Sequence, residues 1–340
     1  MRHLKLARIG LAKRLIFCYN ETMKEKLTPE TIKSKECKER FGCDTRLRAV
    51  FVRHAQKRSG EVFADEGGIS VSPISERGEK ESEIFGERIE KPAQKGYAGR
   101  ISPSERTEAT FNAIEKGYTK LGEAGNKFKT RIRVGLFVGP SGEMEDIYSQ
   151  KFSENKDKLL AKEGTKPEDF SKLLPDKQEE IAEAAEEPVI EEWIFNKKSK
   201  MHRLLPPEDS AARMAVMAGQ YVRMPDKFYS GSELDIFNAT HKTVTEPLLA
   251  EILVLPNGKK IKSLQEIGGS LGTLDSWELD IKNDEKGNKD VRLLLRRKMR
   301  TEGEKTEFEE KEYGVDLKRL EELAKRGIEL NRKEKEEREK

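Results

Sequence analysis

Cysteine and long apolar runs are both scarce in this 340-residue chain. No histidine separates Cys18, Cys37 and Cys43 at metal-site spacing, so neither a disulfide framework nor a zinc site is predicted. Lys and Arg interrupt the opening stretch MRHLKLARIGLAKRLIFCYN, and no later run is long enough to span a membrane. We interpret this stretch as a peripheral N-terminal helix, with binding to a membrane surface as the alternative. The expectation is a cytoplasmic protein with reduced thiols and no integral membrane association.

The chain also lacks an excess of one charge, since 66 Lys and Arg residues face 63 Asp and Glu residues, for a net charge of +3. Nucleic-acid-binding proteins normally present a basic face without equal acid, so no nucleic acid partner is expected. Charged residues are 38% of the chain and hydrophobic residues 35%. A core therefore requires the charge to be concentrated, and Lys and Glu do dominate residues 150–200 and 300–340.

Short apolar strands alternate with helical periodicities from residue 47 onward, which predicts a three-layer α/β/α fold around a mostly parallel sheet. The predicted strands are 47–54, 97–102, 130–137 and 234–241, with a hairpin over 277–295. The predicted helices are 74–89 with Ser75 as N-cap, 104–121, 206–222, and a helix in TVTEPLLAEILVL with Pro247 in its first turn. The predicted organisation is a charged N-terminal extension (1–44), an α/β domain (45–300) with a helical insertion at about 150–205, and a charged helical tail (301–340).

Two of the four histidines stand at the ends of predicted strands, where LRAVFVRH ends in His54 and LDIFNATH ends in His241. Ligands of open α/β sheets bind beyond the carboxyl ends of the strands. Arg53 precedes the first histidine, and Arg106 lies in the first turn of the helix after RISPSER, above the end of another strand. Guanidinium groups and helix N-termini both suit phosphate oxygens. The four residues together indicate a site for a phosphoryl group.

Several ordered segments resemble the successive motifs of the histidine phosphatase superfamily (phosphoglycerate-mutase-like). These segments are VRHAQKRSGE, ISERGEKESEIFG, ISPSERTEATFNAI and DIFNATHKTVTEPLL, and the resemblance spans about 47–300 apart from the insertion. It implies a phosphomonoester hydrolase in which His54 accepts the phosphoryl group. It further implies that Arg53, Arg106 and His241 hold the phosphoryl oxygens, and that no metal or other cofactor is required.

The chain departs from the family pattern beside the first histidine, with Ala55 in place of the usual glycine and Gln56 in place of the usual glutamate. The family also supplies a carboxylate that protonates the leaving group. The loop VGPSGEMEDIY offers Glu143 and Glu145 for that role, and Glu145 is preferred by position. Lys242 follows His241 where the phytase-like branch has aspartate, which favours the mutase-like branch.

Lys57 and Arg58, together with Gln56, are candidates for contacts with an anionic substrate, and a solvated loop is the alternative for this charged stretch. The expected partner is a phosphorylated small molecule or a phosphoprotein substrate. Two other functions fit the same motifs. One is a non-catalytic member that binds a phosphorylated ligand or a protein, and the other is a phosphomutase. No oligomeric state is predicted.

Overall fold

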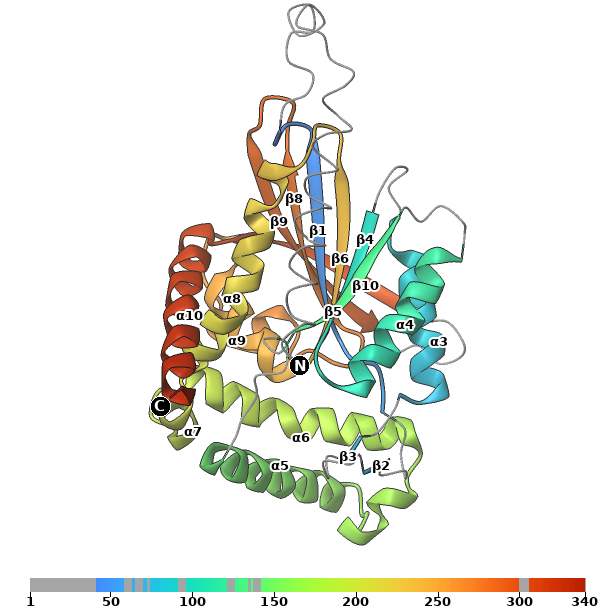
Figure 1. The fold of residues 1–340 in the computed structure, drawn as a ribbon. Coiled ribbons are helices and arrows are strands. Elements are labelled where there is room, and N and C mark those ends of the chain that lie inside the picture. The colour runs from blue at the N-terminus through green and yellow to red at the C-terminus, as the bar shows by residue number, and fades with distance from the viewer. Residues whose placement is uncertain are drawn as a thin grey trace, which may run out of the picture. The chain divides into compact units, whose positions relative to one another are not determined.

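A central sheet organises the unit Gly42–Lys340, into which most of the chain falls. The computed structural model describes residues 41–57, 63–64, 70–71, 74–90, 96–120, 126–133, 136, 142–299 and 306–339. Eight strands lie in the order β5-β4-β6-β1-β8-β9-β10-β7 (Figure 1). The strands are β1 Thr45–Arg53, β4 Gly96–Ile101, β5 Lys127–Ile132, β6 Glu233–Thr240, β7 Leu253–Val254, β8 Ser276–Asn283, β9 Lys289–Met299 and β10 Glu307–Val315. The short strands β2 (Phe63–Ala64) and β3 (Ser70–Val71) pair separately.

The sheet is parallel in one half and antiparallel in the other. Strands β5, β4, β6 and β1 pair in parallel, whereas β1–β8, β8–β9, β9–β10 and β10–β7 pair in antiparallel. The predicted hairpin is β8–β9, and its loop carries Gly287 at φ +83. The three-layer α/β/α fold is thus confirmed, while the parallel arrangement covers only the first four strands.

Helices cover both faces of the sheet because successive side chains of its strands point to opposite sides. Val50 and Val52 of β1 belong to the core under α3 (Glu76–Arg88) and α4 (Glu105–Thr119). Ala49 and Phe51 belong to the larger core under α8 (Pro207–Arg223), α9 (Lys242–Ile252) and α10 (Leu317–Arg338). The predicted N-cap of α3 is confirmed, since the Ser75 hydroxyl accepts the Gly78 N–H at 3.0 Å.

The predicted insertion forms a group of helices beside the carboxyl ends of the parallel strands. It comprises α5 (Glu143–Lys162), the 3₁₀ turn η2 (Pro167–Lys172), α6 (Pro175–Phe195) and α7 (Lys200–Leu204). Helices α5 and α6 lie side by side across that end of the sheet (Figure 1). Val189, Ile190 and Trp193 are fully buried in the larger core. The second half of α6 is therefore core, although the surrounding sequence has the composition of a solvated insertion.

Three local predictions are corrected by the structure. Residues 307–315, expected within the helical tail, form β10, whose main-chain groups pair with β9. Helix α9 begins at Lys242, so Pro247 lies inside the helix and not in its first turn. The strand expected at 130–137 is β5, which occupies 127–132. The hypothesis of an N-terminal helix falls on residues 1–40, outside the described ranges.

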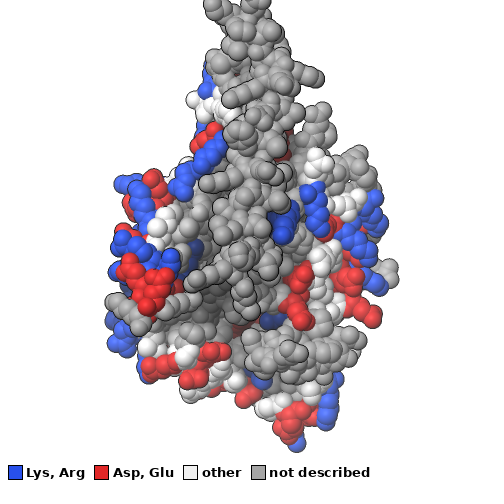
Figure 2. All heavy atoms as spheres, in the orientation of Figure 1, with Lys and Arg blue, Asp and Glu red and all other residues white. Residues whose placement is uncertain are grey.

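Acidic and basic side chains are intermingled on the visible surface of α10 and of the α5–α6 region (Figure 2). This mixture agrees with the near-balance of charge in the sequence. Short 3₁₀ turns, η3 (Pro225–Lys227) and η4 (Leu264–Ile267), connect the remaining elements. No helix within the described ranges combines the length and the apolar character needed to cross a bilayer.

Candidate active site

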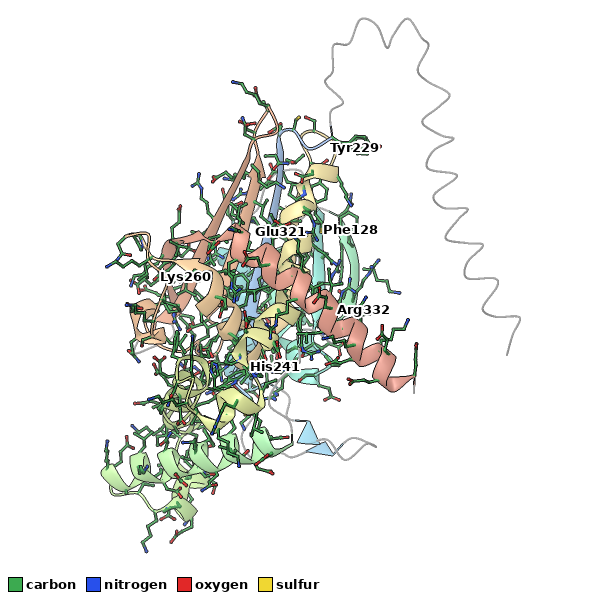
Figure 3. The ribbon with its side chains drawn as sticks, turned by 90° about the vertical axis from the view of Figure 1, so that its left-hand side faces the viewer. Phe128, Tyr229, His241, Lys260, Glu321 and Arg332 are labelled. Atoms are coloured by element: carbon green, nitrogen blue, oxygen red, sulfur yellow. The ribbon has the colours of Figure 1, made fainter. Side chains whose placement is uncertain are left out.

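The two strand-end histidines lie next to each other because β1 and β6 are parallel neighbours. Arg53 pairs in register with Thr240, and the His54 N–H donates to the Thr240 carbonyl oxygen at 3.0 Å. Their imidazole centroids are 5.1 Å apart, with the rings inclined by 62°. His241 lies at the end of the sheet nearer the insertion helices (Figure 3). The separation allows both rings to contact one phosphoryl group.

Hydrogen bonds assign the proton positions on both rings. His54 Nδ1 lies 2.9 Å from the Ala55 carbonyl oxygen, which can only accept, so Nδ1 carries the hydrogen and Nε2 of the neutral ring keeps its lone pair. His241 Nε2 lies 2.9 Å from Ser102 Oγ, which is 2.9 Å from Thr107 Oγ1. The Thr107 hydroxyl donates to the Ser104 carbonyl at 2.7 Å. This chain is satisfied when His241 Nε2 donates to Ser102 and Ser102 donates to Thr107.

Both imidazoles are held in the neutral form. Burial lowers the pKa of His54 well below 6.5, and the positive charges of Arg106 and Arg53 and the ring of His241 lower it further. Burial, followed by Arg106 and Arg53, lowers the pKa of His241 to about 4. These influences also show that the two arginines lie near the histidine pair. At neutral pH His54 therefore has the lone pair that a nucleophile needs.

Arg53 is anchored but keeps an unused donor. Its Nη1 donates to Glu183 Oε1 at 3.0 Å and to the Leu271 carbonyl at 2.7 Å, and its Nη2 lies 3.9 Å from Glu186 Oε2. Its buried Nε has no hydrogen-bond partner among the residues that the structure describes. A buried donor without a partner is unfavourable, and a bound oxyanion would satisfy it.

Arg106 is the less restrained cation of the pair. It occupies the first turn of α4 and is half-buried. Within the described part of the chain, no carboxylate lies within ion-pairing distance of its guanidinium. Burial, and then the nearby charge of Arg53, lower its pKa from 12.5. Two cations close enough to perturb each other favour an anion between them.

The three predicted substrate contacts differ in their surroundings. Gln56 is buried, accepts from the Ser75 hydroxyl at 2.7 Å and donates to Glu179 Oε2 at 2.9 Å, so it links α3 to α6. Lys57 is at the surface, and partial desolvation followed by the charge of Arg106 lowers its pKa. Arg58 lies outside the described residues.

The two predicted proton donors are at the exposed start of α5. Glu143 forms an ion pair with Lys200 at 2.5 Å, and Glu145 is exposed in the same first turn. The structure thus brings together His54, His241, Arg53 and Arg106, and it leaves both glutamates at the surface. The role of either glutamate as proton donor stays a prediction.

Carboxylates of α6 and α9, which sequence reasoning missed, surround the arginine side of the site. Glu186 accepts from the Tyr148 hydroxyl at 2.7 Å and pairs with the buried Lys242 at 2.9 Å. Burial alone would raise the pKa of Glu186, but Lys242 and Arg53 outweigh it and lower this pKa to about 2. No sequence signal separates Glu183 and Glu186 from the many acids of the insertion. Glu246 had one, because it is a lone acid in the apolar stretch TVTEPLL.

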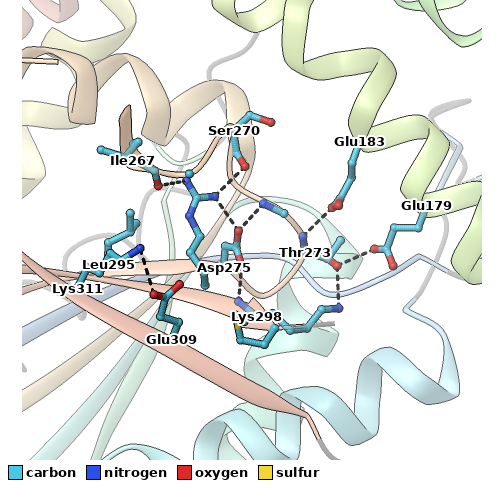
Figure 4. Close-up of a pocket in the computed structure, with 14 residues that line it drawn as sticks. Glu179, Glu183, Ile267, Ser270, Thr273, Asp275, Leu295, Lys298, Glu309 and Lys311 are labelled. Carbon is cyan, nitrogen blue, oxygen red and sulfur yellow. Dashed lines mark hydrogen bonds and ion pairs between the residues drawn. The ribbon is translucent and has the colours of Figure 1, made fainter. Parts of the chain in front are cut away.

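A cavity of about 290 Å³, whose wall includes Glu179 and Glu183 of α6, adjoins this cluster (Figure 4). Glu183 belongs both to its wall and to the anchor of Arg53, since Glu183 Oε1 also accepts the Thr273 N–H at 2.9 Å. Thr273 Oγ1 donates to Glu179 at 2.6 Å. The helix α6 is therefore tied both to the loop before β8 and to the site.

The fold and the four-residue cluster define an α/β protein with a site of two histidines and two arginines at the carboxyl ends of its parallel strands. No family model and no curated protein sequence matches the chain. Solved structures to which it is similar include a phytase from Klebsiella sp ASR1, at 12% identity and a TM-score of 0.42, covering 85% of this chain and 97% of the phytase. They also include the Hafnia alvei phytase, at 10% identity and a TM-score of 0.37, covering 76% of this chain and 84% of the phytase.

A third similar structure is the protein histidine phosphatase SixA complexed with tungstate, at 13% identity and a TM-score of 0.27. It covers 72% of this chain and 93% of SixA. Phytases and SixA are members of the histidine phosphatase superfamily, whose motifs the sequence resembles. Likenesses this distant do not assign an activity, so the function has to be argued from the site residues.

Proposed function

We propose that this protein is a phosphomonoester hydrolase that acts through a phosphohistidine intermediate on His54. The observation that carries the proposal is the hydrogen bond from His54 Nδ1 to the Ala55 carbonyl, which leaves Nε2 as the free nucleophile of a neutral imidazole. Such a ring attacks phosphorus without first losing a proton.

The reaction divides into two displacements. In the first, a bond forms between His54 Nε2 and phosphorus while the bond from phosphorus to the leaving oxygen breaks. In the second, water attacks phosphorus, the nitrogen–phosphorus bond breaks and inorganic phosphate leaves. Charge on the equatorial phosphoryl oxygens must be stabilised in both steps. Arg53 supplies its unused Nε donor and Arg106 a guanidinium without a described counter-ion, while His241, whose Nε2 hydrogen is bound to Ser102, lines the site beside them.

Departure of the leaving oxygen is assisted by a proton. Glu145, with Glu143 as the alternative, is the donor that we propose from the family resemblance, and it would have to reach the site from the start of α5. Glu186 is nearer to Arg53, but Lys242 keeps its pKa at about 2, so it is ionised and holds no proton at neutral pH.

The substrate that we propose is a phosphorylated small molecule or a phosphoprotein. A panel of phosphomonoesters and phosphopeptides, assayed for released phosphate, tests the proposal. Wild type should hydrolyse at least one member, and His54→Ala should lower that rate at least about 1,000-fold. His202→Ala is the matched control, since His202 bonds the Trp193 carbonyl at 2.9 Å and takes no part in the site.

Unchanged hydrolysis by His54→Ala would refute the assignment of the nucleophile. A wild-type protein that binds phosphorylated ligands without releasing phosphate would instead support the non-catalytic function. Transfer of the phosphoryl group to a second substrate hydroxyl, in preference to water, would identify a phosphomutase.

A further inference from the structure

The segment from Ile267, the last residue of η4, to Asp275, which precedes β8, packs against Arg53 and is called here the loop 267–275. The Arg53 N–H donates to the Asp275 carbonyl at 3.0 Å, and the Leu274 N–H donates to the Arg53 carbonyl at 3.3 Å. The side chain is held as well, because Arg53 Nη1 donates to the Leu271 carbonyl at 2.7 Å. The direction of this guanidinium therefore depends on where the loop holds the Leu271 peptide.

The loop is fixed at its two ends by Arg297 of β9. This side chain donates to the carbonyls of Ile267 at 2.9 Å, Gly269 at 2.6 Å and Ser270 at 2.7 Å, and to Asp275 at 2.9 Å. Gly268 and Gly269 adopt φ values of +89 and +93, which other residues rarely adopt. The bond to the Ser270 carbonyl holds one side of the Ser270–Leu271 peptide, and the Leu271 N–H on its other side is bound by a different residue.

Glu246 of α9 is the hydrogen-bond partner of the Leu271 N–H. Its Oε1 accepts the Leu271 N–H at 2.6 Å, so Glu246 binds the N–H of the same residue whose carbonyl holds Arg53. Glu246 is fully buried, and its Oε2 has no hydrogen-bond partner among the described residues. A buried polar atom without a partner destabilises the fold, and the bond to Leu271 uses only one of the two carboxyl oxygens. The carboxyl group at this position calls for a functional explanation.

We propose that Glu246 is a positioning residue, which holds the Leu271 peptide so that the Leu271 carbonyl directs the Arg53 guanidinium toward the phosphoryl site. This inference rests on the proposed function, in which Arg53 binds the phosphoryl oxygens. The contact runs from α9, the helix that begins directly after His241, through the loop to β1. Helix α9 thus positions both His241, which directly precedes it, and Arg53, which it reaches through Leu271.

The pH dependence of activity tests the role of Glu246, because a residue that only supported the fold would leave the pH profile unchanged. Burial raises its pKa to about 8, so the group is mainly protonated at pH 7 and ionises as the pH rises through that value. The charged groups that face it are Lys242 on α9, Glu186 on α6 and Arg53 on β1, with Tyr148 of α5 also nearby. Ionisation places a second buried negative charge behind Arg53, next to Glu186, and this charge opposes binding of a phosphate dianion.

Three variants separate these effects on a substrate that the wild type hydrolyses. Glu246→Ala removes the acceptor, and kcat/KM should fall about 10–100-fold at pH 7, as expected for a misplaced binding group. Glu246→Gln keeps an acceptor oxygen and should stay within about 3-fold of wild type, a difference below 1 kcal/mol in transition-state binding. Glu251→Gln is the matched control, because this acid lies on the same helix and pairs with Arg319 at 2.7 Å.

The pH profile gives the second test. Wild-type kcat/KM should decline above about pH 8, and Glu246→Gln should lack this decline. Wild-type activity in a folded Glu246→Ala protein would overturn the proposal, as would a Glu246→Gln protein as impaired as Glu246→Ala. If Glu246→Ala does not fold, an alkaline decline retained in Glu246→Gln overturns it.

Calorimetric binding of inorganic phosphate at pH 7 keeps this inference separate from the proposed hydrolysis. Glu246→Ala should weaken phosphate binding about 10-fold or more, while Glu246→Gln should leave it unchanged. A wild type without phosphatase activity would refute the proposed function, yet this binding difference would still support the positioning role. Equal phosphate affinity in wild type and Glu246→Ala would overturn it.

Discussion

His54 and His241 combine burial with a neutral charge state, a pairing that favours nucleophilic attack over acid catalysis. Because both rings lose water on folding while two guanidinium groups lie near, protonation is disfavoured twice. A histidine with an ordinary pKa would be partly protonated near pH 6.5 and would lose its lone pair. Burial and the nearby arginines thus keep the imidazoles unprotonated, and His54 nucleophilic, at acidic pH.

The ligand-free protein offers a direct check of these charge states. Titration of the imidazole resonances by NMR should give a midpoint of about 4 for His241 and a midpoint well below 6.5 for His54. The unfolded chain binds these protons near pH 6.5, so the folded protein loses stability as the pH falls below that value. Replacing His241 with Asn should make this loss shallower. A midpoint near 6.5 for either ring would contradict the account.

Helix α6 contributes both to the hydrophobic core and to the candidate active site. Its buried face packs Val189 and Trp193 into the larger core, while Glu183 anchors Arg53. Trp193 is fully buried and its Nε1 donates to the Leu205 carbonyl at 2.8 Å. A helix held this firmly can fix the direction of the arginine that it contacts.

Two substitutions within the insertion test this role of α6. Trp193→Ala should lower the free energy of unfolding by about 3–5 kcal/mol, because a large buried side chain is lost. Leu174→Ala is the control, since Leu174 is 77% exposed, and it should change stability by less than about 0.5 kcal/mol. Urea denaturation measures both. Equal stability of the two variants would show that the packing of α6 contributes little to the free energy of unfolding.

Hydropathy was enough to locate the histidines, because a polar residue directly after an apolar strand marks the strand's end. The ends of β1 and β6 and the first turn of α4 follow from local patterns, and with them His54, His241 and Arg106. The anchors of Arg53 could not be derived in this way. Glu183 and Glu246 are far from Arg53 in sequence, and only the packing of α6 and α9 brings their carboxyl groups near it.

The charged composition of the C-terminal region likewise led to a wrong prediction, a helix where the strand β10 forms. Strand β10 consists largely of acidic and basic residues, as a solvated helix does, and its place in the sheet depends on main-chain pairing with β9. The buried Trp193 side of α6 was hidden because apolar residues occur there among many glutamates. Composition therefore predicted exposure correctly for α5, whose only buried residues are Met144 and Leu160, and incorrectly for the second half of α6.

Across the whole molecule, the strand order accounts for the convergence of the site. Strands β4, β6 and β1 are consecutive parallel neighbours, so Ser102, His241 and His54 follow three adjacent strand ends. The antiparallel strand β8 continues the sheet and brings the loop 267–275 against Arg53. Residues separated by nearly 190 positions in the sequence thus meet at one edge of the sheet.

The central claim, that His54 carries the phosphoryl group, is tested most directly by rapid quench with a ³²P-labelled substrate identified in the panel. The account predicts a phosphoenzyme that is labile in acid and stable in base, with the label located on a His54 peptide by mass spectrometry. The species should be absent from His54→Ala and present in His202→Ala. Turnover without such a species, or a label on another residue, would contradict the account.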